Sequence, residues 1–403
     1  MNRVLIELYD SDALENIISL ETGRYDLLVF VCFKDSDPNP GKRAVMKSVI
    51  TGRTGVNVLF EEAEEKSIDA AVGALGRIIE KYAGSHFSID LTGGDEILIA
   101  ALGKFLSGYS GNDISAHVTD ILSASVSHAA GAPDDPDEVN GRGTLFTFSD
   151  IVRLYGGAVI GTWPDEFGGI MDQKKYEILR VWSAVKDMAA DWNRFCSISY
   201  VNGVEKDADG YISRKFSKAN EKVTSERIMS RLSKRGIIKD YTVSDNILKY
   251  SFHPSAKTEE LYISSGTALE MYTALAASGT GLFRECYTKV LLDVDGVISK
   301  QGTDPTNELD VTMMYGFVPV FVSCKNTEPT KEFLYEIRTM AQHFGGKYAL
   351  AMLVSSKAAF QPVKERAKEM HIMLIDDVQS LSLKEFRSAI SGTVKKFVDN
   401  IRS

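Results

Sequence analysis

The sequence predicts an α/β protein built from three consecutive units. Short apolar strands alternate with amphipathic helices over the first 125 residues, which indicates a doubly wound parallel sheet. A helix followed by a hairpin then occupies residues 224–252, and further strands and helices fill residues 262–403. We therefore expect domains at residues 1–160, 161–260 and 261–403.

The first unit begins with the strand VLIELY, after which Asp10-Ser11-Asp12 can cap a helix starting near Ala13. The next strand, DLLVFVCF, is apolar on both faces, as a buried parallel strand should be. The other elements expected here are strands at 57–62 and 86–91 and helices at 66–82 and 96–106. Sheets of this kind bind ligands at the carboxyl ends of their strands. Residues 132–143 are rich in Pro, Gly and Asp and predict a loop, followed by a strand-helix-strand passage over 144–161.

The middle unit is predicted to be helical and basic. A long helix is expected near 174–194, and a second over 224–238, ending at Gly236. DYTVSDNILKYSF then predicts a hairpin with its turn at Asp245-Asn246, so this unit is winged-helix-like. Residues 205–257 contain 12 Lys or Arg and 7 Asp or Glu, a local charge of +5.

The third unit predicts a mixed α/β domain around a central hairpin. Its expected helices are at 266–278, 330–344 and 361–370, and its expected strands at 287–294, 308–315, 320–325, 348–356 and 372–377. Pro319 cannot donate a ladder hydrogen bond, so the second strand of the hairpin is expected to begin after it.

The composition excludes several classes of protein. With 44% hydrophobic and 25% charged residues in 403, the chain is neither disordered, fibrous nor membrane-spanning. We expect no signal peptide, and four scattered cysteines without CxxC spacing argue against a zinc site or a disulfide scaffold and fit a reducing cytoplasm. The net charge of −9 argues against indiscriminate binding to nucleic acid, but it averages +5 in residues 205–257 with −14 elsewhere.

The most informative segment is the hairpin over residues 307–325. If its strands pair tightly, residues whose numbers sum to 632–633 lie opposite, so Asp310 faces Ser323 and Glu308 faces Lys325. Side chains alternate between faces, so two carboxylates, a hydroxyl and an ammonium share one patch. Glu270, on the preceding helix, can add another carboxylate.

This patch has two interpretations. In one, Asp310 and Glu270 hold Mg²⁺ or Mn²⁺, which polarises a phosphoryl oxygen and acidifies a bound water, while Lys325 stabilises the developing charge. In the other, the patch is an exposed sheet face with a Glu308–Lys325 cross-strand pair.

Two further segments carry weaker signals. The turn after Asp90, Thr92-Gly93-Gly94, lets a backbone approach phosphate at a helix N-terminus, although Gly-Gly links between strand and helix are common. The chain has no GxGxxG or GxxxxGK[ST] motif, which argues against ordinary dinucleotide or P-loop binding. In the middle unit, four basic residues at helical spacings can contact phosphates, form a solvated helix face, or belong to a linker that transmits a conformational change; they are Arg227, Arg231, Lys234 and Arg235.

A family resemblance adds to these interpretations. The order Glu270, Asp310, Ser323-x-Lys325 resembles the PD-(D/E)xK nuclease fold, as does the helix that precedes GGKYALAMLVSS. The pattern NELDV…CK behind a unit with DLTGG is similar to the CARF-domain nucleases, accessory effectors of type III CRISPR systems. FTFSDIVRLYGG also resembles the segment leaving the CARF domain. The resemblance covers most of the chain, and the basic middle unit is its weakest part.

The resemblance implies a homodimer whose CARF domains bind a cyclic oligoadenylate, with cyclic tetra-adenylate matching the two-fold symmetry. The implied pocket residues are the loop after the first strand, the Gly-Gly turn and a cation of the next loop: Tyr9, Asp10, Ser11, Asp12, Thr92, Gly93, Gly94, Asp95 and Lys42. That next loop is otherwise a solvated connection, in which Lys34 and Arg43 also lie. Asp95 departs from the Thr or Lys often found there, and is unfavourable beside phosphate unless it caps the helix or meets a ribose hydroxyl.

The second departure is Ser323, where the family usually has a glutamate in E-x-K. We therefore expect a cytoplasmic, metal-dependent nuclease acting on DNA or RNA and activated by cyclic tetra-adenylate, with Asp310, Lys325, Glu270, Glu308 and Ser323 at its catalytic site. The alternative is a CARF-regulated nucleic-acid-binding protein with an inactive nuclease site. A lesser alternative is slow cleavage of the activator by the CARF domain itself.

Overall fold

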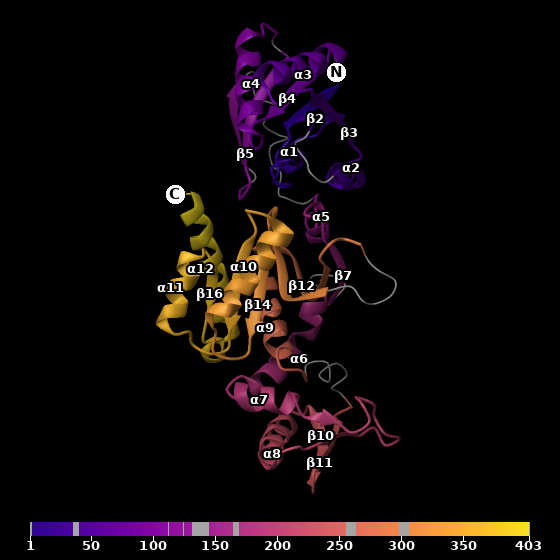
Figure 1. Cartoon of the computed structure of the whole chain (residues 1–403). Helices are drawn as coiled ribbons and strands as arrows, with labels where there is room; N and C mark the ends of the chain where they lie inside the picture. The colour runs from indigo at the N-terminus through magenta and orange to yellow at the C-terminus, as the bar shows by residue number, and fades with distance from the viewer. Residues whose placement is uncertain are drawn as a thin grey trace.

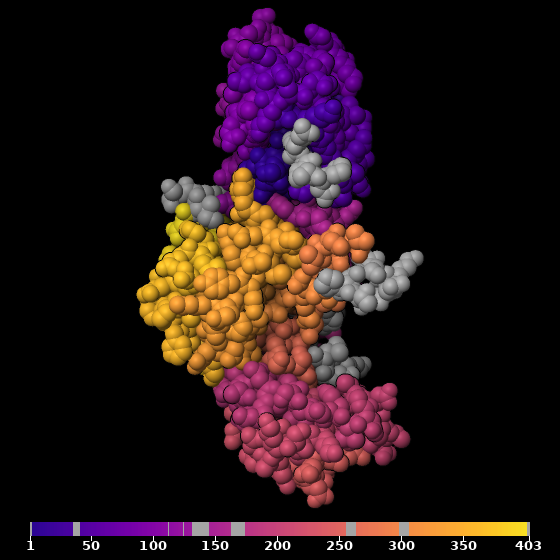
Figure 2. Space-filling view, in the orientation of Figure 1, coloured from indigo at the N-terminus to yellow at the C-terminus, as the bar shows by residue number. Residues whose placement is uncertain are grey.

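The computed structural model describes residues 2–34, 40–111, 113–123, 125–130, 145–163, 169–254, 263–297 and 306–402. These residues form two six-stranded sheets and one four-stranded sheet with helices packed on them, which confirms the α/β class. The N-terminal unit lies at one end of an elongated molecule, the C-terminal unit at its centre and the middle unit at the other end (Figure 1), and the surface view shows the same order (Figure 2). The loop predicted at 132–143 lies outside the described residues. None of the helices in the described ranges is both long and apolar enough to cross a membrane.

The N-terminal sheet has the strand order β3-β2-β1-β4-β5-β6, and its neighbouring strands are parallel except β5 with β6. Its strands are β1 (Arg3–Leu8), β2 (Leu27–Phe33), β3 (Asn57–Ala63), β4 (His86–Asp90), β5 (Ile114–Asp120) and β6 (Ser125–Ala130). This order confirms the predicted doubly wound parallel sheet. The chain extends from β1 to one side and returns at β4 to build the other, so the switch point lies between β1 and β4.

Helices cover both faces of this sheet. They are α1 (Ile18–Thr22), α2 (Pro40–Thr54), α3 (Ile68–Lys81) and α4 (Glu96–Gly108). Leu5 of β1 packs in the same core as Ile50 of α2, whereas its neighbour Val4 packs in the core that contains Ile78 of α3. The helix expected near Ala13 instead begins at residue 18. Residues 13–17 form turns, where the Asn16 amide donates to the backbone carbonyls of Asp10 and Asp12.

The middle unit begins with two helices where one was predicted over 174–194. They are α6 (Gly169–Val185) and α7 (Ala189–Cys196). An unbroken helix would bond the Met188 N–H to the Ala184 carbonyl. That carbonyl accepts instead from Arg231 at 3.3 Å, and the Met188 N–H bonds to Val185. The long-range arginine contact therefore accompanies the break, which local periodicity does not reveal.

The rest of the middle unit contains a helix followed by a hairpin, as predicted. The elements are β8 (Ser199–Tyr200), β9 (Ile212–Lys215), α8 (Ala219–Lys234), β10 (Ile238–Ser244) and β11 (Ile247–Phe252), with the sheet order β10-β11-β9-β8. The hairpin turns at Asp245, whose φ of 47° places it in the left-handed region. Helix α8 starts five residues before the predicted position 224.

The C-terminal sheet has the order β16-β15-β14-β13-β12-β7. Its strands are β7 (Ala158–Trp163), β12 (Phe283–Asp293), β13 (Thr306–Tyr315), β14 (Val318–Lys325), β15 (Leu350–Ser355) and β16 (Met373–Ile375). Its helices are α9 (Thr267–Ser278), α10 (Lys331–Gly345), α11 (Gln361–Glu369) and α12 (Leu383–Arg402). The predicted boundary at 160–161 falls inside β7, which follows α5 (Phe148–Leu154) and pairs with β12 of this sheet. The first strand predicted in the 144–161 passage is absent from its described part, since residues 145–147 are not in a strand.

The central hairpin has the predicted register. Val311 pairs with Val322 and Tyr315 with Val318, so paired numbers sum to 633. The expectation that β14 begins after Pro319 is wrong, because the strand starts at Val318 and Pro319 lies opposite Met314. Backbone groups of successive residues point to opposite neighbours, and pairing with β15 begins only at Val320. The N–H that Pro319 lacks would therefore have pointed to the side where β14 is not yet paired, and no hydrogen bond of the sheet is lost.

The N-terminal and C-terminal units contact each other directly through the loop after β1. Asp12 accepts a hydrogen bond from the Tyr155 hydroxyl at 2.6 Å and another from the backbone N–H of Lys347 at 3.2 Å. Glu15 forms an ion pair of 2.8 Å with the Lys347 ammonium. The middle unit lies at the far end (Figure 1), so the alternative in which it links the other two is not supported by this arrangement.

Candidate functional sites

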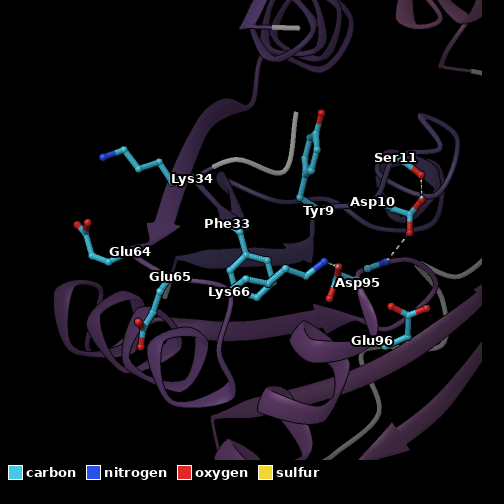
Figure 3. Close-up of a pocket in the computed structure, with 11 residues that line it drawn as sticks. Tyr9, Asp10, Ser11, Phe33, Lys34, Glu64, Glu65, Lys66, Asp95 and Glu96 are labelled. Carbon is cyan, nitrogen blue, oxygen red and sulfur yellow. Dashed lines mark hydrogen bonds and ion pairs between the residues drawn. The ribbon is translucent and has the colours of Figure 1, made fainter. Parts of the chain in front are cut away.

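A pocket of about 400 Å³ opens at the carboxyl ends of β1, β2, β3 and β4 (Figure 3). Its lining residues come from the loops after these strands; they are Tyr9, Asp10, Ser11, Phe33, Lys34, Glu64, Glu65, Lys66, Gly94, Asp95 and Glu96. Five of the nine predicted ligand-binding residues are among them: Tyr9, Asp10, Ser11, Gly94 and Asp95. The pocket is adjacent to the switch point between β1 and β4, where doubly wound sheets bind ligands.

Asp10 ties two of the pocket loops together. Its carboxylate accepts from the backbone N–H of Asp12 at 2.7 Å and from that of Gly94 at 3.1 Å. Burial raises the pKa of Asp10, but these backbone hydrogen bonds outweigh burial and hold the pKa below its ordinary value. Asp10 is therefore ionised, holds the Gly-Gly turn through a hydrogen bond and also lines the pocket.

The glycines of this turn are required by close packing. Gly94 has φ of 116°, and a Cβ there would lie 2.7 Å from the Cβ of Leu8. A Cβ on Gly93 would lie 2.8 Å from the Cβ of Glu15. Thr92 is outside the set of lining residues: its hydroxyl donates to Asp90 at 2.5 Å and accepts from the Thr119 N–H at 2.7 Å. Thr92 therefore stabilises the turn without lining the pocket.

Asp95 caps helix α4, which is one of the two roles that the sequence analysis allowed for an acid beside a phosphate. Its side chain accepts from the Ile97 N–H at 3.0 Å and forms an ion pair with Lys66, which Figure 3 shows in the middle of the pocket. Burial raises the pKa of Asp95, but the bonds to Lys66 and Ile97 outweigh it and lower that pKa. The carboxylate is thus already partnered within the protein.

The sequence did not indicate Lys66, which follows β3 and lies over the Phe33 ring at 5.9 Å. Its position after a strand next to β2 is the signal that would have found it. Lys42, which was predicted, is exposed on α2 and outside the set of lining residues, and Asp12 faces the C-terminal unit instead. Arg43 pairs with Glu62 at 2.5 Å and is outside the set of lining residues, so the cations among the described lining residues are Lys34 and Lys66.

A cluster of buried polar side chains lies on β1, β4 and the elements beside them, next to the pocket. Asp90 is fully buried and accepts from the Ser19 hydroxyl at 2.5 Å, and its nearest oxygen lies 3.9 Å from a His117 ring nitrogen. Glu7 lies beside it on β1, where burial, together with the charge of Asp90, raises the pKa of Glu7 well above its ordinary value. Of this cluster, the sequence singled out only Asp90, as the first residue of DLTGG.

A second site is the groove between the β13–β14 hairpin and helix α10, with a volume of about 530 Å³. Four of the five predicted catalytic residues line it: Glu308, Asp310, Ser323 and Lys325. Asp310 accepts from the Cys324 backbone N–H at 2.6 Å and from the Ser323 hydroxyl at 3.3 Å. Burial raises the pKa of Asp310 despite these hydrogen bonds and the nearby Lys325 charge.

Glu270, the fifth predicted residue, reaches this region from helix α9. Its side chain is 6% exposed, and its Oε2 has no hydrogen-bond partner in the described structure. Burial and then the negative charge of Asp310 raise the pKa of Glu270 to about 8. Gly266 leaves room for this carboxyl, since a Cβ there would make the end of the Glu270 side chain move.

Lys325 leans toward helix α10. Its Nζ lies 3.9 Å from a Glu336 carboxylate oxygen and 4.7 Å from the centre of the Phe333 ring. Glu308 is exposed at the edge of the same groove. The Glu308–Lys325 pair considered in the sequence is therefore replaced by contact with the helix, and the ammonium stays within the groove.

Lys289 of β12 is a site residue that the sequence did not reveal. Its neighbours Thr288 and Val290 pair with Val311 and Leu309, which flank Asp310, and the charge of Lys289 lowers the pKa of Glu270. Its φ of 50° is left-handed within a strand, and the β12–β7 register shifts between Thr288 and Leu291. Bulges of this kind redirect side chains next to functional sites.

The carboxylates of this groove are suited to holding one small divalent ion together with waters, and not to surrounding a metal with protein ligands alone. Within the described ranges, no group of three or more His, Cys, Asp or Glu side chains is arranged to hold a metal. Mg²⁺, however, is commonly bound by one or two carboxylates together with waters and substrate phosphate. The two acids with raised pKa, a buried Glu270 with an unpartnered oxygen and a half-buried Asp310, are compatible with that chemistry.

The predicted basic helix divides into two parts. Arg227 pairs with Asp191 of α7 at 2.5 Å and Arg231 with Asp187 of the α6–α7 turn at 2.5 Å, so both attach α8 to this helix pair. Lys234 and Arg235 instead line a groove beside α6. The structure therefore separates the four residues that the sequence grouped.

The comparisons with known proteins bear on the fold. No family model and no curated protein matches this chain. Protein VC1899 from Vibrio cholerae superposes with a TM-score of 0.74 at 15% identity, covering 98% of both chains. Can2 from Sulfobacillus thermosulfidooxidans, in complex with cyclic tetra-adenylate, gives a TM-score of 0.62 at 14% identity, covering 98% of this chain and 99% of its own.

This chain has their fold. A third structure, a type III CRISPR defence DNA nuclease activated by cyclic oligoadenylate, gives a TM-score of 0.50 at 15% identity. That match covers 89% of this chain but only 46% of the nuclease. The first two superpositions cover 98% of this chain, so they include all three of its units.

Proposed function

We propose that this protein is a metal-dependent nuclease of type III CRISPR defence, activated by cyclic oligoadenylate. The observation that carries the proposal is the C-terminal groove, where Asp310 and Lys325 line one cavity and Glu270 lies buried nearby with an unpartnered oxygen. The fold shared with Can2, whose structure is a complex with cyclic tetra-adenylate, supports the proposed activator, because the superposition includes the N-terminal unit that holds the pocket.

The groove residues have separable roles in phosphodiester hydrolysis. Asp310 and Glu270 would hold Mg²⁺ or Mn²⁺, and such an ion supplies polarisation of a phosphoryl oxygen and an acidified water. Lys325 stabilises negative charge that develops on the phosphate. Ser323 orients Asp310 through its hydroxyl, and Glu308 at the rim is available to position water.

The N-terminal pocket supports a nucleotide activator. Lys34 supplies positive charge for a phosphate, beside Lys66 in its ion pair with Asp95. The N–H groups of Gly94 and Ile97 are already bonded to Asp10 and Asp95, so the lysines and not the start of α4 would meet the phosphates. Acids at the rim, such as Glu64, are suited to ribose hydroxyls. A ring of four adenylates has two-fold symmetry, so two copies of the chain would each hold half of it.

A cleavage assay tests the proposal. The protein is mixed with Mn²⁺ and cyclic tetra-adenylate and offered single-stranded DNA, RNA or supercoiled plasmid. Cleavage should require both additions and should be lost in Asp310→Ala and Lys325→Ala but kept in Lys331→Ala, an exposed lysine at the start of α10. Thermal shifts with rings of three, four and six adenylates identify the activator.

The second candidate is a ligand-regulated nucleic-acid-binding protein with an inactive nuclease site. Ser323 favours it, because a neutral hydroxyl stands where a third carboxylate would strengthen metal binding. Binding of nucleic acid without cleavage of any of the three substrates would establish this candidate and exclude the nuclease.

A further inference from the structure

A third cavity, with a volume of about 590 Å³, lies between α6, the end of α8 and the segment that leads into α12. We call it the cationic groove. Four of its lining residues carry positive charge: Arg180, Lys186, Lys234 and Arg235. None of the described lining residues is acidic.

Two acidic side chains near the cationic groove, Asp187 and Glu385, are engaged elsewhere. Asp187 accepts two hydrogen bonds from Arg231, at 2.5 and 3.0 Å. Glu385 accepts from the Ser382 backbone N–H at 2.8 Å. The groove therefore presents concentrated positive charge on a chain whose net charge is −9, and this favours an anionic occupant.

Aromatic side chains accompany these cations. Tyr176 is 81% exposed and lies one helical turn before Arg180. Trp182 and Tyr272 stack with their ring centres 5.0 Å apart in the lining, but both are buried, so Tyr176 is the exposed ring of the groove. Positive grooves with exposed aromatic rings bind single-stranded nucleic acid, because unpaired bases offer faces on which the rings stack.

We propose that the cationic groove binds the backbone of single-stranded nucleic acid, with Tyr176 stacking on an unpaired base. The proposal rests on the proposed nuclease function and adds a class of substrate to it. Tyr272 follows Glu270 by two residues on α9, a rotation of about 200° around the helix. The cationic groove therefore lies on the other side of α9 from Glu270 and acts on substrate affinity and not on the chemical step.

Binding is measured on the full chain by fluorescence anisotropy of labelled 20-nucleotide single-stranded DNA and RNA and of the corresponding duplex, with EDTA present. The test variant is the pair Lys234→Glu and Arg235→Glu. The matched control is the pair Lys215→Glu and Lys239→Glu, which makes the same charge change at exposed positions of the same unit. Tyr176→Ala tests stacking alone.

The groove pair should bind single strands about tenfold more weakly at low salt and reduce the salt slope by about two, whereas the control pair should bind nearly as wild type. Tyr176→Ala should weaken binding about tenfold without changing the salt slope. Equal losses in both charge-reversal pairs, equal affinity for duplex, or displacement by poly-glutamate at the same charge concentration would each overturn the proposal.

The two proposals fail separately. If cleavage occurs, the groove pair should raise KM and leave kcat unchanged. If no substrate is cleaved but the groove pair alone weakens binding, the nuclease function is wrong and the groove assignment stands. If cleavage is normal and binding is unaffected by the groove pair, only the groove assignment is wrong.

Discussion

The buried Glu270 carboxyl makes the stability of the metal-free C-terminal unit depend on pH. Its pKa is about 8 in the folded protein, against an ordinary value of 4.5 that applies to the unfolded chain. Below pH 4.5 the group is protonated in both states. Between 4.5 and about 8 the unfolded chain releases the proton while the folded protein keeps it, so the free energy of unfolding falls as pH rises.

The size of this effect follows from the interval between the two pKa values. At about 1.4 kcal/mol per pH unit, the loss is about 3 kcal/mol at pH 7 and about 5 kcal/mol above pH 8. Glu270→Gln replaces the titrating group with a neutral one of the same shape. Its free energy of unfolding should therefore lack this component of the pH dependence, whatever constant offset the amide introduces.

Urea unfolding in EDTA from pH 5 to pH 8.5 measures the difference. Tryptophan fluorescence reports the relevant region, because Trp182 stacks on Tyr272, two residues after Glu270. Glu308→Gln, at an exposed carboxyl of the same groove, is the comparison variant: it removes only a minor contribution to the raised pKa of Glu270 and should lose far less of the pH dependence than Glu270→Gln. Parallel curves for wild type and Glu270→Gln would refute the reasoning, as would Mn²⁺ stabilising both proteins equally at pH 8.

Three further predictions concern the strained strand, the domain contact and the turn. Lys289→Gly should raise the free energy of unfolding of the C-terminal unit in urea by about 1 kcal/mol, because glycine adopts the left-handed backbone without strain. The same variant should slow cleavage, and an unchanged cleavage rate would show that Lys289 has no role in the site. Asp12→Ala removes both bonds to the C-terminal unit and should reduce activation about tenfold while cyclic tetra-adenylate still binds, which paired cleavage and calorimetric titrations would check. Gly94→Ala should abolish the thermal shift with cyclic tetra-adenylate, since the Cβ would meet Leu8, and a preserved shift would contradict the assigned pocket.

The sequence was sufficient where local pattern and pairing arithmetic determine the structure. Alternating strands and helices predicted the parallel sheet, and the sum of 633 placed Asp310 against Ser323, whose hydroxyl bonds to it. Glu270 was found because it opens a helix that packs under the hairpin. These features depend on contacts between residues that are close in the chain or joined by a tight turn.

The sequence was insufficient where a distant contact decides the outcome. The break between α6 and α7 involves Arg231, more than 40 residues away from the carbonyl it binds. Lys289 enters the site through a left-handed backbone that no residue preference of lysine predicts. Arg227 looked available for phosphate because its partner, Asp191, lies on another helix.

The position of β7 has a consequence for how the chain folds. This strand is made before the middle unit, yet it pairs with β12, in which Thr288 lies opposite Trp163. During synthesis the N-terminal and middle units can each complete their own sheets, whereas the central sheet must wait for its last strands. Until then β7 is an unpaired strand edge, so folding of the central unit should be slow and the stage most exposed to aggregation.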